Sequence, residues 1–228
     1  MSLVCLSRGA IRHATLSSGT ARSGKSQLLR RYCIPLLVFT ILLAASCASA
    51  PGTATIPVRP PVSIFPSDLP VMGEGTISFQ QFSAYFAKGN PGIDSLVLQE
   101  LYSAYSESCK AEGVRLDVAL AQMIHETAFL RFTGTVNASQ NNFAGMGTVD
   151  ARTPGLSFPD RRTGALAQVQ HLKGYASTEK LKLPLVDPRF RYIRRGQAPT
   201  VLSLAGRWAA DVDYGRKLMA HIQRLHAS

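Results

Sequence analysis

The chain has 228 residues, 46% of them hydrophobic, which allows one or two domains with an ordinary core. The formal net charge of +11 is uneven, because six of the 25 basic residues lie within residues 1–46 and no acidic residue occurs before Asp68. The remainder has 19 basic and 14 acidic residues, so its net charge of +5 suits an anionic polymer or a membrane surface. No nucleic-acid recognition motif is present, and we expect no nucleic-acid partner.

The first 46 residues are predicted to be a signal peptide. A basic region ending at Arg31 precedes an apolar run, residues 34–45, that is too short for an ordinary membrane-spanning helix. The sequence LAASC, residues 43–47, resembles a bacterial lipoprotein box with alanine where leucine is usual. This resemblance implies that Cys47 is acylated after cleavage and anchors the exported protein to a membrane. The alternative is a plain secretory signal, cut after Ala48 or Ala50.

The cysteines indicate export without disulfide bonds. Cys5 and Cys33 leave with the signal, Cys47 carries lipid, and Cys109 alone remains, so no internal bridge forms. Cys109 lies in a helical apolar pattern and is expected to be a small core residue.

Residues 47–75 are predicted to be an extended tether, because Pro, Gly, Ser and Thr dominate them. The folded domain is expected at residues 76–228. Apolar residues at helical spacing predict a first helix over residues 78–88 and a second from Asp94 to about residue 111. Glycine follows each of these two patterns.

The third predicted helix begins near Leu116, and Glu126 lies close to its end, after the mostly apolar run VALAQMI. An ionised carboxylate is costly in such surroundings, so its pKa should rise or it should have a partner. A carboxylic acid that stays protonated near neutral pH can protonate a leaving group. The alternative is an ordinary glutamate at a helix end, paired with Arg131.

The rest of the chain is predicted to add a small lobe and further helices. Residues 137–160 are rich in Gly, Asn, Thr and Pro with short apolar pairs, which favours a small β-hairpin or an irregular lobe. A helix is expected over about residues 163–175, and two closing helices near residues 201–205 and 214–226. The expected fold class is therefore α+β, mostly α.

Five sequence elements resemble the glucosaminidase family of peptidoglycan hydrolases, glycoside hydrolase family 73. Gln122, Glu126 and the sequence NNFAG match the family pattern AQ-x-x-x-E-[ST] followed by NNFAG. The later elements follow in the family's order: SFPD at 157–160, AQVQHLKGYAS at 167–177, DPRF at 187–190 and LAGRWAADVDYGRKL at 204–218. The resemblance covers roughly residues 90–227. It implies a lysozyme-like helical domain that cleaves the β-1,4 bond after N-acetylglucosamine in peptidoglycan, without a cofactor.

The resemblance also implies roles for single residues, with Glu126 as the general acid. Glycoside cleavage normally uses a second group on the other face of the sugar, and Asp150 and Asp160 are the candidates, although each is also a common turn residue. The alternative is attack by the substrate's own 2-acetamido oxygen, which would be held intramolecularly. Tyr214, the second tyrosine of the family's closing motif, is then expected beside the acetamido group.

Four further residues are expected to bind the sugar chain. Asn141, Asn142 and Phe143 match the family's cleft wall, and Trp208 replaces the first tyrosine of the closing motif, where it would stack on a sugar or pack. A cluster of arginines could meet the carboxylates of peptide stems or form a solvated face: Arg189, Arg191, Arg194 and Arg195.

Metal chemistry is not expected. His125-Glu126 begins like the zinc motif H-E-x-x-H, but residue 129 is phenylalanine, so the second ligand is absent. The expected protein is a monomeric, exported lipoprotein that hydrolyses peptidoglycan. Alternatives are a muramidase, a lytic transglycosylase, or a wall-binding lipoprotein without catalytic activity.

Overall fold

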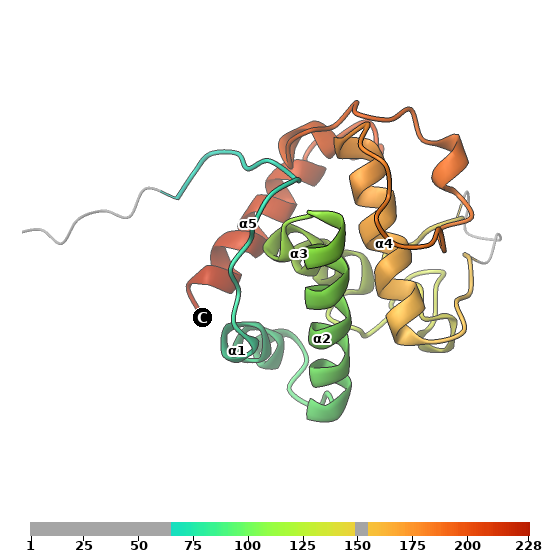
Figure 1. The fold of residues 1–228 in the computed structure, drawn as a ribbon. Coiled ribbons are helices and arrows are strands. Elements are labelled where there is room, and N and C mark those ends of the chain that lie inside the picture. The colour runs from blue at the N-terminus through green and yellow to red at the C-terminus, as the bar shows by residue number, and fades with distance from the viewer. Residues whose placement is uncertain (1–64, 149–154) are drawn as a thin grey trace, which may run out of the picture. The chain divides into compact units, whose positions relative to one another are not determined.

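The computed structural model describes residues 65–148 and 155–228, and this part of the chain is built from α-helices (Figure 1). Its five α-helices are α1 (Phe79–Gly89), α2 (Ser95–Glu112), α3 (Leu116–Thr127), α4 (Arg161–Ala176) and α5 (Tyr214–His226). Three single 3₁₀ turns lie between them: η1 (Ala138–Gln140), η2 (Phe190–Tyr192) and η3 (Leu202–Leu204). The predicted helices are confirmed to within a few residues, except that the one near 201–205 is only the turn η3.

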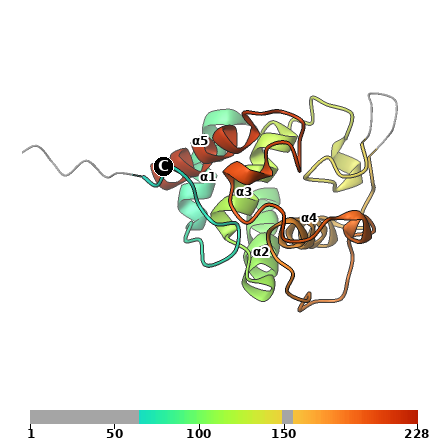
Figure 2. The ribbon, with the colours of Figure 1, turned by 90° about the horizontal axis from the view of Figure 1, so that it is seen from above.

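The core is organised around α3. All residues from Val118 to Ile124 are fully buried, because a helix that is apolar on every side is stable only with neighbours on every side. In Figure 1, α5 lies along α3, and α2 lies along α4. The segment between α4 and α5 crosses one end of this bundle, above α3 and α4 in Figure 1 and in front of them in Figure 2.

Polar side chains fix where the outer helices begin. Ser78 and Gln81 form a capping box at α1, in which each side chain accepts the other's backbone N–H. Asp94 accepts the N–H of Leu96 at the start of α2, as its position in the sequence predicts. α2 ends at Gly113, whose φ of 73° is a left-handed conformation that glycine adopts without strain.

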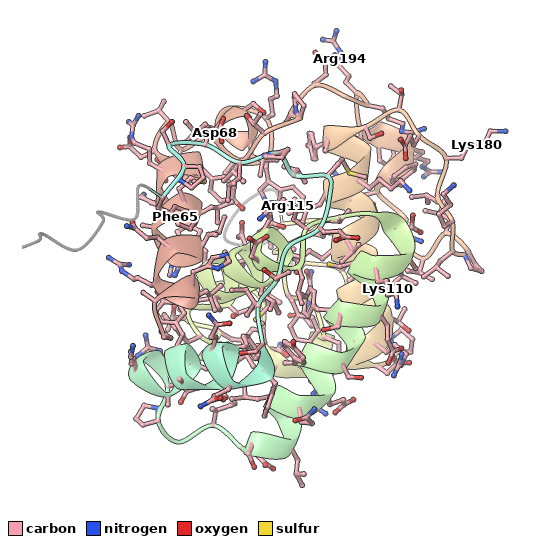
Figure 3. The ribbon with its side chains drawn as sticks, turned by 60° about the vertical axis from the view of Figure 1, so that its left-hand side comes forward. Phe65, Asp68, Lys110, Arg115, Lys180 and Arg194 are labelled. Carbon is pink, nitrogen blue, oxygen red and sulfur yellow. The ribbon has the colours of Figure 1, made fainter. Side chains whose placement is uncertain are left out.

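Residues 65–75 form a strap that packs on the helices, so the described part of the predicted tether is folded. Val71 is fully buried; its N–H donates to Pro199 O (2.9 Å) and its carbonyl accepts the N–H of Arg115 (2.9 Å). Figure 3 shows the strap running from Phe65 past Asp68 and on beside Arg115. Residues 65–75 therefore pack as part of the folded domain, because a proline-rich chain can still bury apolar side chains and pair its backbone.

The predicted β-hairpin is not present in the described residues, where the β-contacts are isolated bridges, and this part of the expected fold class is wrong. In the segment predicted as a hairpin, Asn141, Gly145 and Gly147 have φ of 49°, 61° and 82°, a left-handed conformation incompatible with a strand. The described residues of this segment therefore form turns, and Figure 2 shows them to the right of α3. Residues 149–154, including Asp150, lie outside the described part.

The described helices are all too short or too polar to cross a membrane. The apolar run 34–45 and Cys47 lie outside the described residues. Cys109 is buried and unpaired, as predicted for a core residue, and burial raises the pKa of its thiol.

Candidate functional site

Glu126 is the last residue but one of α3, and its neighbour Thr127 fixes how the helix ends. The Thr127 hydroxyl donates to Met123 O (2.7 Å) and accepts the N–H of Leu130 (2.9 Å). The chain then turns through left-handed residues, beginning with Ala128 at φ 49°. A hydroxyl residue directly after the glutamate therefore holds the turn, and the carboxyl group is left on the other side of the helix.

Two described residues donate hydrogen bonds to the Glu126 carboxyl group, and both bonds fall on the same oxygen. Tyr214 Oη donates to Oε1 at 2.5 Å, and Trp208 Nε1 donates to the same atom at 3.1 Å. Burial raises the pKa of Glu126, and the two donors partly oppose this rise. Arg131 does not pair with Glu126; its Nε donates to Ala128 O.

A chain of buried amides leads from the core to this carboxyl group. Tyr105 Oη donates to Gln168 Oε1 (2.5 Å), and Gln168 Nε2 donates both to Ala119 O (3.2 Å) and to Gln122 Oε1 (2.9 Å). Gln122 Nε2 in turn donates to the hydroxyl of Tyr214 (3.0 Å). We call Tyr105, Gln168, Gln122 and Tyr214 the amide relay.

The direction of every hydrogen bond in the amide relay is set by the carbonyl of Ala119. A backbone carbonyl only accepts, so Gln168 must direct its NH₂ group toward α3, and Gln122 must present its oxygen to Gln168. The NH₂ group of Gln122 then faces Tyr214, whose own proton is free to point at Glu126. Since Oε1 already accepts two donors, the proton of neutral Glu126 belongs on Oε2.

Glu126 Oε2 lies beside Gly145, at the edge of two adjoining cavities. The acid compartment, about 210 Å³, is lined by Glu126, Phe132, Asn142, Thr148 and neighbouring backbone. The arginine compartment, about 170 Å³, is lined by His171, Tyr175, Arg189, Trp208 and the 144–148 backbone. Gly145 and Thr148 line both, so the two compartments adjoin. A Cβ atom at Gly145 would lie 3.6 Å from Glu126 Oε2. Gly145 has a φ of 61°, a left-handed conformation that favours glycine.

The predicted sugar-binding residues of the NNF sequence are used largely inside the protein. Asn142 Nδ2 donates to Met146 O (2.9 Å) and to Leu156 O (3.0 Å), and its Oδ1 accepts the N–H of Met146 (3.0 Å). Asn141 Nδ2 donates to Phe158 O (3.1 Å), and Phe143 is buried against Tyr105. Asn142 lines the acid compartment, but these contacts favour a role in shaping its wall over direct binding of sugar by these side chains.

The loop that carries Asn141, Asn142 and Phe143 is held against α4 at Gly164. A Cβ atom there would lie 1.8 Å from Asn141 O, so only glycine lets the loop approach this closely. The contact fixes the position of the loop that ends at Gly145.

Asp160, a candidate second catalytic group, caps α4 instead of facing Glu126. Its side chain accepts the N–H of Thr163 at 2.7 Å, and this bond is the main reason that its pKa is lowered. Asp160 lines neither compartment. The structure thus brings Tyr214 and Trp208 to Glu126, but not Asp160.

His125, His171 and Cys109 lie in different surroundings. His125 packs against Tyr214 (5.5 Å between ring centroids), Cys109 is in the core, and His171 Nδ1 bonds Asp187 Oδ2 (2.6 Å). Within the described ranges, no three His, Cys, Asp or Glu side chains are grouped closely enough to hold a metal ion. Burial lowers the pKa of His125.

The contacts of Gln122, Gln168 and the His171–Asp187 pair were not predicted from the sequence. Gln122 had a signal in the sequence: it precedes Glu126 by four residues, so both lie on one face of α3, and a glutamine amid apolar residues needs a buried partner. Gln168 and Asp187 had no local signal, because their partners lie on other elements.

Comparison with known proteins identifies one family and one relative. The profile of a family described as "Glucosaminidase: Mannosyl-glycoprotein endo-beta-N-acetylglucosaminidase" matches residues 102–227. A protein of Borreliella burgdorferi (strain ATCC 35210) described as "Uncharacterized protein" is 38% identical over 148 residues, which cover 65% of this chain and 72% of that protein. No solved structure matches the chain significantly.

Proposed function

Because this chain belongs to the glucosaminidase family of glycoside hydrolases, we propose that it is an endo-β-N-acetylglucosaminidase acting on cell-wall glycan strands. It would cleave the β-1,4 bond after N-acetylglucosamine. The observation that carries this proposal is the environment of Glu126: burial raises its pKa, and Oε2, which accepts no hydrogen bond from the described residues, lies beside a cavity.

In the first step, Glu126 Oε2 donates its proton to the glycosidic oxygen as the bond to the anomeric carbon breaks. The carboxylate that results keeps the hydrogen bonds from Tyr214 and Trp208 on Oε1. These two donors interact more strongly with the carboxylate than with the neutral acid, so they stabilise the charge that develops in the transition state. Burial thus favours the protonated acid before proton transfer, and the two donors stabilise the carboxylate after it.

In the same step, the 2-acetamido oxygen of the sugar is proposed to attack the anomeric carbon. Among the described residues that line the two compartments, Glu126 is the sole carboxylate, which favours this substrate-assisted course over a second acidic residue. Water then adds to the anomeric carbon, the carbon–oxygen bond to the acetamido group breaks, and Glu126 takes a proton from the water. Both the acid and the configuration at the anomeric carbon are restored.

The decisive experiment is mass spectrometry of the fragments released from purified sacculi. Reducing ends of N-acetylglucosamine are expected from the wild-type protein, and none from Glu126→Gln. N-acetylmuramic acid at the reducing end would indicate a muramidase, and anhydro-muramic ends a lytic transglycosylase. If the wild-type protein binds sacculi but releases no fragments, it is a wall-binding protein without this activity.

We further propose that the enzyme is exported and held at a membrane by an acylated Cys47, with the residues between Cys47 and the strap as its tether. The lipoprotein-like sequence LAASC supports this assignment. Expression in cells fed a clickable fatty acid tests it: the wild-type protein should be labelled, and Cys47→Ala should not. Equal labelling of the two proteins would refute acylation at this cysteine.

A further inference from the structure

We propose that the arginine compartment is a carboxylate-binding subsite, in which Arg189, Tyr175 and His171 recognise an acidic group carried by the glycan strand. The inference rests on the proposed function, since it assigns a substrate group to a cavity that adjoins the one lined by Glu126. Peptidoglycan offers two sources of carboxylate close to the sugar chain: the stem peptide, and the lactyl group of muramic acid once the peptide is removed.

Three polar side chains converge on this compartment from two elements. His171 and Tyr175 are four residues apart on α4, so they share one face, and their ring centroids are 5.4 Å apart. Arg189 comes from the segment that follows α4 and lines the same cavity. Trp208 closes the side toward Glu126, with its ring centroid 5.0 Å from that of His171 at 90°. The aromatic rings therefore hold the polar groups in place.

A buried carboxylate, Asp187, fixes two of these residues. Its Oδ2 is 2.6 Å from His171 Nδ1, and its Oδ1 accepts the backbone N–H of Arg189 at 2.8 Å. Because Nδ1 is engaged, Nε2 is the ring nitrogen of His171 that remains for a ligand. Asp187 thus orients the imidazole and sets the position from which the Arg189 side chain extends.

Arg189 supplies a positive charge that no acidic side chain of the described residues neutralises in an ion pair. The centroid of the Tyr192 ring lies 5.2 Å from the guanidinium carbon of Arg189. Burial raises the pKa of Tyr175, and the nearby Arg189 partly offsets that rise, so this hydroxyl and the guanidinium act on one another. A guanidinium fork beside a phenol hydroxyl suits a planar carboxylate, which can accept from both.

The other arginines of this segment have different surroundings, so the predicted arginine cluster is not one surface. Arg191 donates to the Tyr192 hydroxyl (2.7 Å), and Arg195 donates to the carbonyl oxygens of Ser177 and Glu179. Arg194 projects outward from the molecule in Figure 3. Of the four, only Arg189 lines the compartment, and exposed Arg191 provides a control that removes the same charge two residues away.

The test measures binding by titration calorimetry in a Glu126→Gln background, so that no ligand is cleaved. The ligands are a soluble disaccharide–peptide with free carboxylates, the same compound with its carboxylates amidated, and a peptide-free disaccharide with a free lactyl group. Arg189→Gln should weaken binding of the free-carboxylate ligand about tenfold or more, and leave the amidated ligand unchanged. Arg191→Gln should leave both within about twofold. The free-carboxylate ligand whose binding is weakened by Arg189→Gln shows whether the stem peptide or the lactyl group supplies the carboxylate.

Tyr175→Phe provides a second variant that keeps the aromatic packing. It should weaken binding of the responding ligand about threefold to tenfold, by loss of one hydrogen bond. The subsite is refuted if Arg189→Gln binds free and amidated ligands as its parent does, or if Arg191→Gln weakens binding as much. Failure of the proposed function has a different signature: wild-type protein that releases no fragments from sacculi, whatever the carboxylate dependence of binding.

Discussion

Two glutamates lie at helix ends, Glu112 on α2 and Glu126 on α3, and their pKa values are shifted in opposite directions. Burial raises the pKa of both side chains. For Glu112 that effect is outweighed by donors on both oxygens: the N–H groups of Lys182 and Leu183, and the ammonium group of Lys173 at 2.9 Å. Among the described residues, Glu126 has two donors on a single oxygen and no cation partner, and its pKa stays raised. The number and charge of the donors, not burial alone, therefore decide the direction in which each glutamate's pKa is shifted.

This difference in pKa matches two different roles: Glu112 is a structural anion, and Glu126 is the proposed catalytic acid. Glu112 is an anion that joins the end of α2 to α4 and to the loop after it, since Lys173 belongs to α4 and Lys182 to that loop. Glu126 lies beside a cavity and can exchange its proton with a ligand there. Substituting each glutamate by glutamine should therefore damage different properties.

Glu126→Gln should produce the largest loss of activity. The amide keeps the shape and can still accept from Tyr214 and Trp208, but it cannot donate a proton to the glycosidic oxygen. We expect the rate of wall lysis to fall roughly a hundredfold to ten-thousandfold, with an unchanged melting temperature. Turbidity of sacculi and calorimetry measure the two quantities. Near-wild-type lysis would remove Glu126 from the mechanism.

Glu112→Gln should instead reduce stability. It leaves the fully buried ammonium group of Lys173 without its counter-charge, which costs about 3–5 kcal/mol in comparable cases. Lysis per folded molecule should remain close to that of the wild type. Urea denaturation measures the loss, and Glu107→Gln, at an exposed ion pair with Arg162 on the same helices, is the matched control, which should lose far less stability because solvent screens that pair. Equal losses for the two variants would contradict the distinction.

The pH dependence of stability sharpens this comparison. The folded-state pKa of Glu112 is lowered, so its ionisation stabilises the fold above the unfolded-state pKa, and this contribution disappears as the pH falls through the folded-state value. The stability gap between the wild type and Glu112→Gln should therefore narrow in acid. Denaturation curves at a series of pH values test the sign, and a gap that widens on acidification would be inconsistent with an ionised Glu112.

The sequence predicted what depends on neighbours along the chain, and missed what depends on contacts across it. Helical spacing and caps such as Asp94 predicted the helices, and the position of Glu126 after an apolar run predicted its raised pKa. The hairpin was wrong because a segment rich in Gly and Asn has no pattern that separates a strand from successive left-handed turns. Asp160 was an equally open choice, since a turn residue and a catalytic acid look alike in sequence.

Long-range hydrogen bonds explain the rest of what was missed. The amide relay joins α2, α3, α4 and α5 through residues whose neighbours in the sequence do not indicate their hydrogen-bond partners. Tyr214 was expected beside a substrate acetamido group, and the structure adds that its hydroxyl donates a hydrogen bond to Glu126. The relay therefore allows predictions about Glu126 that the sequence does not.

Tyr214→Phe should lower lysis less than Glu126→Gln, by about tenfold. The loss of one donor on Oε1 destabilises the Glu126 carboxylate, so the pKa of Glu126 should rise further. Since the acid must be protonated, activity falls as the pH rises through this pKa, and the alkaline limb of the kcat/KM profile should move to higher pH. An unshifted limb together with full activity would show that Tyr214 does not act on Glu126.

Gln122→Met should give the smallest effect, in the same direction. Methionine approximates the buried volume of the side chain but removes the N–H that bonds the Tyr214 hydroxyl and helps to lower the high pKa of that phenol. Without this bond, Tyr214 is a weaker donor to Glu126, and the alkaline limb should move upward by less than in Tyr214→Phe. We expect lysis within about threefold of the wild type and a loss of about 1–3 kcal/mol in stability, because Gln168 loses a partner. In the double variant Gln122→Met/Tyr214→Phe the limb should lie where Tyr214→Phe alone places it, since Gln122 acts only through that hydroxyl. Additive shifts would instead mean that Gln122 influences Glu126 by a separate route.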